Sequence, residues 1–485
     1  MILAIDQGTT GTTCIVFDEG GRAAGRAYRE FEQHFPRPGW VEHDAAQIWD
    51  VTQAVPHDAL ADAGVDGARL AGIGITNQRE TVVAWDRRTG EPLHRAIVWQ
   101  DRRTAARCDE LREAGHEQLV RERTGLVLDP YFSGTKMEWL AREGVLGADA
   151  ALGTVDSWLV FKLTGRHLTD YSNASRTLLF DTARLRWDEE LCELLGVPAA
   201  ALPEPLPSAQ VYGETDAFGG SVPVAGIAGD QQAALFGQAC HAEGRGKSTY
   251  GTGSFLLQNA GEDRPDPPEG LVTTVAWGLP DRVDYAIEAS IFVTGAAVQW
   301  LRDALGVIET ADETDALARS LDSNDGVYFV PALTGLGSPH WDAYARGTIV
   351  GLTRGTGREH LARAALEAIA YQTADAVRAT EDASGVALDE LRADGGATVN
   401  RWLMQFQADV LGVPVVLPEL AETTALGAAY LAGIATGLWS EEDTRAMWRE
   451  GARYEPDMSE DERAMLLEGW RRALDRARGW ERPGV

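Results

Sequence analysis

A carboxylate, several hydroxyls and two glycines lie together near the start of the chain, where Asp6–Gly11 reads DQGTTG. The apolar runs Ile2–Ile5 and Thr12–Phe17 flank this stretch, so we expect two strands joined by a glycine-containing turn. Glycine exposes backbone N–H groups, which together with threonine hydroxyls can surround phosphate oxygens. A carboxylate at the strand end can hold Mg²⁺, usually through water. The alternative is an ordinary hairpin whose aspartate only stabilises the turn.

A second glycine-rich hairpin is expected over Lys247–Leu257, around the letters YGTGSF at 250–255. It does not fit a P-loop, because position 241 is histidine where that motif needs glycine and because a strand follows instead of a helix. Two phosphate-type hairpins in one chain indicate two similar domains that face one cleft.

Asp230 follows the apolar strand Val224–Ala228 and precedes the expected helix Ala233–Gln238. A helix N-terminus favours the ionised carboxylate, as a general base or a metal ligand requires. The alternative is a plain helix cap.

Arg79 and Glu80 follow the buried strand Leu70–Thr76, and ligands of open α/β sheets bind at such strand ends. An adjacent donor and acceptor can hydrogen-bond the hydroxyls of a small polyol, although a solvated ion pair is the alternative. Trp99 can lie against the carbon skeleton of a polyol, with core packing as its alternative.

The elements that must position these residues alternate between strands and helices, which indicates the α/β class. Gly72 and Gly74 do not make a dinucleotide fingerprint, because the third glycine and a directly following helix are missing, and a dehydrogenase is therefore disfavoured. Residues from about 440 onward are expected to form acidic helices that cover the C-terminal part. The other main elements expected are the helices Ala45–Ala63, Met137–Arg142, Gly295–Ala304, His360–Thr380, Asn400–Leu411 and Thr423–Tyr430, and the strands Thr81–Asp86, Gly326–Phe329, Gly347–Leu352 and Leu391–Asp394.

With 485 residues the chain should form two or three domains. No apolar run approaches the ~20 residues needed to span a bilayer, and no signal peptide is expected before the strand that begins at Ile2. The scattered cysteines favour neither a disulfide framework nor a zinc site; they are Cys14, Cys108, Cys192 and Cys240. We therefore expect a cytoplasmic protein with no membrane insertion.

The net charge is −30, and a chain this acidic is not expected to bind nucleic acid. Its only lysines are Lys136, Lys162 and Lys247. Surplus acid with few lysines is compatible with adaptation to a salt-rich cytoplasm. A GC-rich genome combined with an acidic surface is the alternative.

Several segments, spread over nearly the whole chain, together resemble the FGGY family of sugar and polyol kinases. The segments include AIDQGTT (4–10), PGWVEHD (38–44), GITNQRET (74–81), DPYFSGTK (129–136), DYSNASRT (170–177), GIAGDQQAALFGQ (226–238), YGTGSF (250–255), DGGATVN (394–400) and TALGAAYLAG (424–433). The resemblance implies the actin/hexokinase/Hsp70 ATPase fold. This fold has two ribonuclease H-like α/β domains, here 1–238 and 239–485, with the catalytic cleft between them.

The resemblance also implies ATP-dependent phosphorylation of glycerol to sn-glycerol 3-phosphate, by a homodimer or homotetramer. Asp230 matches the family's catalytic base and Asp6 its Mg²⁺-associated aspartate. The positions that match glycerol-binding residues are Arg79, Glu80, Trp99, Tyr131, Asp230, Gln231 and Phe255. Those that match the ATP site are Thr9, Thr10, Gly11 and Thr12 in the first hairpin, Gly251 and Thr252 in the second, and Gly295, Gln299, Gly396, Ala397 and Asn400 around the nucleotide.

The chain departs from the family in three places. Thr13 stands where an arginine or lysine is usual, so we expect either a weaker hold on the phosphates or a substitute arginine from elsewhere. The segment Asp216–Val222 lacks the arginine that binds fructose 1,6-bisphosphate in many bacterial members, which predicts insensitivity to that inhibitor. Glu455–Arg463 differs from the segment through which some members bind a phosphotransferase protein.

Two other functions stay open at this stage. Another acceptor, such as a ketopentose or gluconate, would keep the family and change the substrate. A non-catalytic actin-like ATPase or chaperone-type binding protein would hydrolyse ATP slowly without an acceptor and would not need Asp230.

Overall fold

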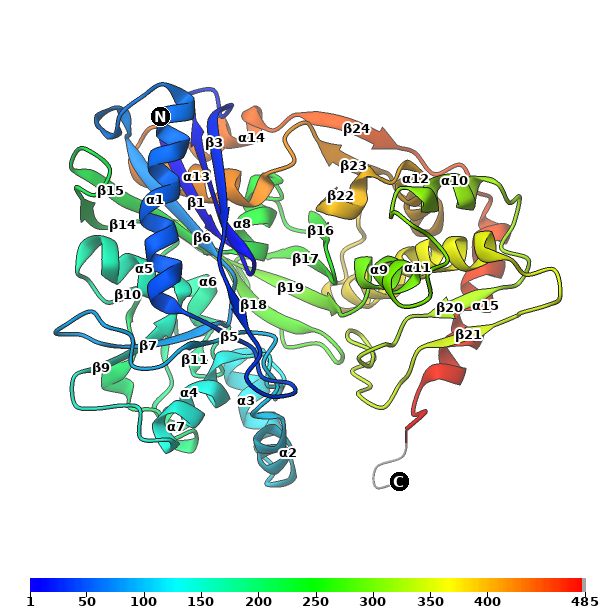
Figure 1. Cartoon of the computed structure of the whole chain (residues 1–485), viewed down its shortest axis with the longest axis horizontal. Coiled ribbons are helices and arrows are strands. Elements are labelled where there is room, and N and C mark those ends of the chain that lie inside the picture. Colours follow the sequence, from blue (N-terminus) through cyan, green and yellow to red (C-terminus); the bar gives the residue numbers. More distant parts are fainter. Residues whose placement is uncertain (482–485) are drawn as a thin grey trace.

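The computed structural model describes residues 1–481 and contains two large mixed sheets, each with helices packed against it (Figure 1). The six-stranded sheet has the order β14 (Ala209–Thr215), β15 (Val222–Gly229), β6 (Gly72–Asn77), β1 (Ile2–Gln7), β2 (Gly11–Phe17) and β3 (Ala23–Glu30). The seven-stranded sheet has the order β18 (Val272–Gly278), β19 (Val283–Ile291), β17 (Ser254–Gly261), β16 (Gly246–Tyr250), β22 (Leu391–Asp394), β23 (Val415–Pro418) and β24 (Glu450–Tyr454). The predicted α/β class is confirmed.

The two sheets repeat one arrangement of strands. β1 pairs antiparallel with β2 and parallel with β6, while β2 pairs antiparallel with β3. In the second sheet β16 pairs antiparallel with β17 and parallel with β22, while β17 pairs antiparallel with β19. The glycine-rich turns predicted from the sequence therefore occupy equivalent places, between β1 and β2 and between β16 and β17.

Smaller sheets complete the strand pattern. A five-stranded sheet has the order β4 (Gln33–His34), β5 (Glu42–His43), β8 (Ala96–Ile97), β7 (Val82–Asp86) and β9 (Ala150–Thr154). The two-stranded pairs are β10 (Leu168–Asp170) with β13 (Glu204–Leu206), β11 (Phe180–Asp181) with β12 (Arg186–Trp187), and β20 (Tyr328–Val330) with β21 (Thr348–Val350).

Fifteen helices are described within residues 1–481. They are α1 (Ala45–Ala63), α2 (Ala105–Glu113), α3 (Glu117–Thr124), α4 (Ser133–Arg142), α5 (Val155–Thr164), α6 (Tyr171–Ala174), α7 (Glu189–Leu194), α8 (Asp230–Gly237), α9 (Gly295–Asp303), α10 (Glu313–Arg319), α11 (Arg358–Ser384), α12 (Arg401–Leu411), α13 (Thr423–Ala435), α14 (Glu441–Met447) and α15 (Glu460–Ala477). The limits predicted for α1 are confirmed: the Asp44 carboxylate caps its first turn, and Gly64 ends it with φ +67°.

Strand β1 is buried on both faces, which explains its unbroken apolar sequence. Leu3 and Ile5 pack in the cluster that includes Ile48 of α1, whereas Ile2 and Ala4 pack with Leu426 of α13. Helices therefore cover both sides of this sheet, as its near-continuous hydrophobic run requires.

Helix α13 comes from the C-terminal half of the chain but packs against the N-terminal sheet and α8. A Cβ atom on Gly74 would lie 2.2 Å from the Ala428 carbonyl oxygen, and one on Gly427 would lie 1.8 Å from the Ala233 carbonyl oxygen. Glycine is needed at both positions because the backbones themselves are in contact. The helix predicted at Thr423–Tyr430 is confirmed, and its small residues allow this close packing.

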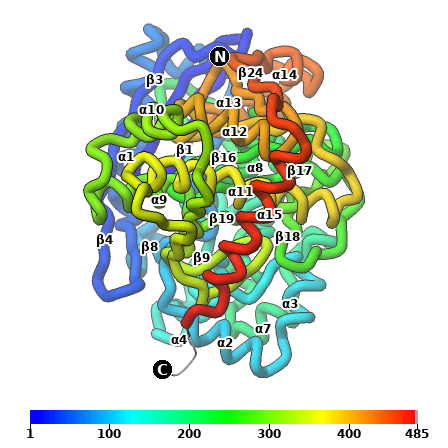
Figure 2. Tube along the Cα trace, turned by 90° about the vertical axis from the view of Figure 1, so that its right-hand side faces the viewer, coloured from blue at the N-terminus to red at the C-terminus, as the bar shows by residue number. Residues whose placement is uncertain are grey.

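The C-terminal region differs from the expected set of acidic helices. Glu450–Tyr454 is strand β24, which pairs antiparallel with β23 at the edge of the seven-stranded sheet, so the prediction of helix alone was wrong. Figure 2 shows α15 as the red segment along the outside of the second sheet's helices, where Trp470 stacks on Tyr371 of α11 with ring centroids 5.4 Å apart. Among residues 1–481, no helix is both long enough and apolar enough to cross a membrane.

Candidate functional site

Asp230 lies where β15 ends and α8 begins, with its side chain about one-third exposed. One carboxylate oxygen, Oδ1, lies 3.3 Å from Arg79 Nε and accepts a hydrogen bond of 2.7 Å from the Gln231 backbone N–H. Burial raises the pKa of Asp230, while the positive charges of Arg79 and Lys247 oppose that shift. The carboxylate is thus held in place by its partners and remains open to a bound molecule.

Arg79 connects the residues predicted to bind the acceptor. Its Nη2 donates to the Tyr131 hydroxyl at 3.1 Å, and its guanidinium carbon lies 5.7 Å from the centre of the Phe255 ring. Trp99 meets Tyr131 edge to face, with ring centroids 5.8 Å apart. The structure therefore brings the seven predicted acceptor residues into one cluster, in which charged side chains lie next to three aromatic rings.

Two residues that sequence analysis did not assign to the site anchor this cluster. Glu288 accepts hydrogen bonds from Arg79 Nη1 at 2.6 Å and from Arg176 Nη2 at 2.9 Å. Burial alone would raise the pKa of Glu288, but the two arginines lower it to about 2. The signals in the sequence are one glutamate inside the apolar strand β19 and one arginine at the end of the polar run 170–177.

Glu80 adopts a strained backbone conformation at the edge of the same network. Its φ is +61°, in the left-handed region that non-glycine residues rarely occupy, and its side chain is buried. Arg176 Nε donates to Glu80 Oε1 at 2.7 Å. Such strain persists only where the surroundings over-determine it, which is frequent at functional sites.

Lys136 of α4 fixes the loop that carries Tyr131. Its Nζ donates to the carbonyl oxygens of Pro130 at 2.6 Å, Tyr131 at 2.7 Å and Phe132 at 3.1 Å. The side chain is fully buried, and burial lowers the pKa of Lys136 to about 8. Three carbonyl partners satisfy all three donors of the ammonium group, so the loop is held in one conformation.

The first hairpin joins the acceptor cluster through Thr9, whose hydroxyl accepts a hydrogen bond of 2.9 Å from Trp99 Nε1. The turn closes with a bond from Gly8 N–H to the Gly11 carbonyl at 2.9 Å, and Thr10 is exposed. Thr12 Oγ1, by contrast, is buried and has no hydrogen-bond partner within residues 1–481. Thr9 and Thr10 are thus more accessible to a bound molecule than Thr12.

Asp6 lies on β1 opposite Thr13 of β2. Burial, together with the negative charges of the nearby carboxylates Asp230 and Glu422, raises the pKa of Asp6 to about 8. The negative charges of these carboxylates disfavour ionisation of Asp6, and a bound cation would relieve that repulsion.

A cavity of about 700 Å³ beside the second hairpin is lined by every residue predicted around the nucleotide in the second half of the chain. These residues are Gly251, Thr252, Gly295, Gln299, Gly396, Ala397 and Asn400. The Gly295 N–H donates to the Gly251 carbonyl at 3.0 Å, and a Cβ atom on Gly295 would lie 2.6 Å from that oxygen. The cavity has the size of a small-molecule site, and close backbone contacts shape its wall.

His43 bonds the side chains of Gln33 and Gln78, which in turn donate to carbonyl oxygens of the first hairpin. Protonation of His43 should therefore lower the stability of the folded protein. The ring is buried between Gln33 Oε1, at 2.7 Å, and Gln78 Nε2, at 3.3 Å, and burial lowers the pKa of His43 from 6.5 to about 4. The unfolded chain therefore binds more protons than the folded chain in this interval. We expect up to about 3 kcal/mol of stability to be lost as the pH falls from 6.5 to 4.

The measurement is the unfolding midpoint as a function of pH for the wild type and for His43→Asn. The variant should be less stable at pH 7 and should show a smaller decrease between pH 6.5 and 4. Equal pH dependence in both proteins would show that His43 is not a source of the acid sensitivity.

Two sheets that repeat one strand arrangement, each with a glycine-rich hairpin, and a partly exposed carboxylate beside a buried arginine form an arrangement typical of phosphoryl-transfer enzymes. Residues 1–237 match the N-terminal domain and residues 246–436 the C-terminal domain of the FGGY family of carbohydrate kinases. The chain belongs to the FGGY family of carbohydrate kinases.

Several relatives are similar over their full length. The chain is 56% identical to a glycerol kinase of Deinococcus radiodurans, covering 99% of this chain and 98% of the relative. It is 54% identical to glycerol kinase 2 of Thermotoga maritima, covering 99% of each. A solved structure of Plasmodium falciparum glycerol kinase with ADP is 35% identical, covers 98% of each chain and superposes with a TM-score of 0.91.

Proposed function

We propose that this protein transfers the terminal phosphoryl group of ATP to glycerol and forms sn-glycerol 3-phosphate. The observation that carries the proposal is the position of Asp230, which is partly exposed within a cluster of one arginine and three aromatic side chains. Full-length relatives that are glycerol kinases support it.

Asp230 acts in this proposal as the general base. Its free oxygen would accept the proton of a terminal hydroxyl as that hydroxyl attacks the phosphorus atom. Arg79, Glu80, Tyr131 and Gln231 supply the donors and acceptors that three hydroxyls require, while Trp99 and Phe255 cover the carbon skeleton. Pairing of Asp230 with Arg79 at 3.3 Å opposes the rise in pKa that burial causes, and so favours the deprotonated form that a base needs.

The residues present fit a magnesium ion. The charges of Asp230 and Glu422 act on Asp6, but among the described residues no group of three or more His, Cys, Asp or Glu side chains could hold a metal by itself. Mg²⁺ binds through one or two carboxylates together with waters and substrate phosphates, which suits a site of this kind. When bound, the ion supplies charge neutralisation for the phosphates.

The proposed reaction also requires an arrangement of domains and of the nucleotide. We infer two domains, 1–238 and 239–485, whose approach would exclude water, a competing acceptor, from the cleft. The nucleotide would lie in the cavity beside the second hairpin, with its phosphates directed toward Thr9, Thr10 and Gly11. We further infer that the protein is cytoplasmic and forms a homodimer or a homotetramer.

Acceptor choice and the need for an acceptor are tested together by coupled ADP release. We expect release to depend on glycerol and to be at least about 100-fold more efficient, as kcat/KM, with glycerol than with a ketopentose or gluconate. Preference for one of those sugars would retain the family and replace the substrate. Slow release that no acceptor stimulates would favour a non-catalytic actin-like ATPase.

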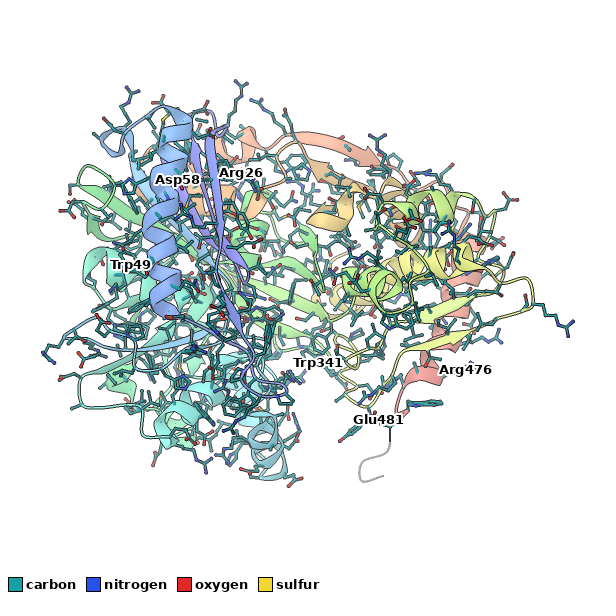
Figure 3. All side chains as sticks on the ribbon, in the orientation of Figure 1. Arg26, Trp49, Asp58, Trp341, Arg476 and Glu481 are labelled. Carbon is teal, nitrogen blue, oxygen red and sulfur yellow. The ribbon has the colours of Figure 1, made fainter. Side chains whose placement is uncertain are left out.

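Thr13→Arg should tighten the binding of ATP, because Thr13 lies beside Asp6 and the first hairpin without a positive charge. Thr13 pairs across the strands with Tyr28 of β3, and Arg26 lies two residues from Tyr28 on the same face of that strand. Arg26, labelled in Figure 3, forms an ion pair of 2.8 Å with Glu422. We expect the KM for ATP to fall about 10-fold, the worth of one charge-assisted hydrogen bond. Thr13→Met is the control for size, and an unchanged KM in the arginine variant would show that the charge is already supplied, with Arg26 the first candidate.

A further inference from the structure

Lys247 is a buried lysine to which the proposed reaction assigns no contact with a substrate. It lies on β16, four residues before Gly251, and has no exposed surface. The chain contains only three lysines, and lysine is seldom fully buried unless it is paired. Its burial beside the acceptor cluster therefore needs a reason.

The Lys247 ammonium group bridges the two halves of the site. Its Nζ donates to Gln231 Oε1 at 2.6 Å and to Thr249 Oγ1 at 2.8 Å. Gln231 is the second residue of α8, beside Asp230, whereas Thr249 lies on the strand that leads into the second hairpin. One side chain thus joins the helix that carries the proposed base to the hairpin beside the nucleotide cavity.

The bond to Lys247 fixes which end of the Gln231 amide faces the cleft. An ammonium group has three donors and no acceptor, so only the amide oxygen can point toward it. The other end of the amide, Nε2, lies close enough to Asp230 to help lower the pKa of that carboxylate. Gln231 is therefore held with its N–H₂ group beside Asp230, where it can donate to a hydroxyl of the acceptor.

We propose that Lys247 is a positioning residue that orients Gln231 toward the acceptor and ties this contact to the second hairpin. The inference rests on the proposed function, because it assigns the free amide to a hydroxyl of glycerol. A role limited to packing would stabilise the protein without favouring one substrate over the other, and the two roles can be separated by kinetics.

The experiment compares Lys247→Met, Gln231→Ala and the double variant in glycerol-dependent ADP release. We expect Lys247→Met to lower kcat/KM for glycerol about 10- to 100-fold, mainly through KM, while the KM for ATP changes less than about 2-fold. The double variant should be no worse than Gln231→Ala, because both changes remove the same contact. Lys162→Met removes a partly buried lysine away from the cleft and should leave the kinetics unchanged.

Thr249→Val provides an independent variant in case Lys247→Met does not fold, since it removes one anchor and keeps the charge. It should raise the KM for glycerol about 3-fold or more and leave that for ATP unchanged. A folded Lys247→Met with normal kcat/KM for glycerol, additive effects in the double variant, or a normal KM for glycerol in Thr249→Val would each overturn the inference. Wild-type protein without glycerol-dependent release would instead overturn the proposed function.

Discussion

Asp230→Asn lowers the kcat of glycerol-dependent ADP release roughly 100- to 10,000-fold, the range expected when a general base is removed. The amide keeps the size of the side chain and can still accept from the Gln231 N–H, but it cannot take a proton from the attacking hydroxyl. The KM for ATP should change little, because the nucleotide cavity is lined by residues of the other lobe. Coupled ADP release at saturating glycerol and ATP measures the effect.

The control for Asp230→Asn is Asp188→Asn, which removes a charge from the N-terminus of another helix, α7, where Asp188 caps the Leu191 N–H at 3.0 Å. This variant should lose some stability and retain full turnover. If Asp230→Asn retained more than a tenth of the wild-type kcat, another group would have to accept the proton. Acceptor-independent release that is unaffected by the substitution would favour the non-catalytic ATPase.

Local sequence patterns were sufficient to place the hairpins and Asp230. A glycine-rich break between two apolar runs specifies a turn wherever the chain goes, and a carboxylate between a strand and a helix must lie at the strand end. The structure confirms the positions of both hairpins and of Asp230. It also confirms the predicted strand Leu391–Asp394, which is β22 and ends before Gly395. The resemblance to a family then supplied roles that residue types alone left open.

Partners that meet only through tertiary structure were not predictable in the same way. Arg79 looked like half of an ion pair with Glu80, yet its closest carboxylate is Glu288, which lies 209 positions away. Nothing local to β19 specifies that partner. The edge strand β24 was missed for a related reason, because pairing with β23 outweighs the weak local preference of a short, largely exposed segment.

Glu288→Gln should be the most destabilising single change in the site. Glu288 pairs with Arg79 and Arg176, and all three side chains are at most 1% exposed. Removing its charge leaves Arg176 paired with Glu80, and Arg79 with only the more distant carboxylates of Glu80 and Asp230. Breaking a buried ion pair from one side costs about 3–5 kcal/mol. Denaturant unfolding with and without glycerol measures this loss.

The same substitution should weaken glycerol binding beyond the loss of stability. With Glu288 neutral, Arg79 would lose its strongest acceptor and would turn toward Asp230, which already lies 3.3 Å from its Nε. That movement would engage the Asp230 carboxylate more fully. It would also break the hydrogen bond that Arg79 Nη2 donates to the Tyr131 hydroxyl. We expect the KM for glycerol to rise at least about 10-fold.

Glu367→Gln is the matched control, because Glu367 is a buried carboxylate bonded to Arg363 and Tyr371 in α11, away from the cleft. That variant should be destabilised with an unchanged KM for glycerol, and the same result in Glu288→Gln would reduce Glu288 to a purely structural residue.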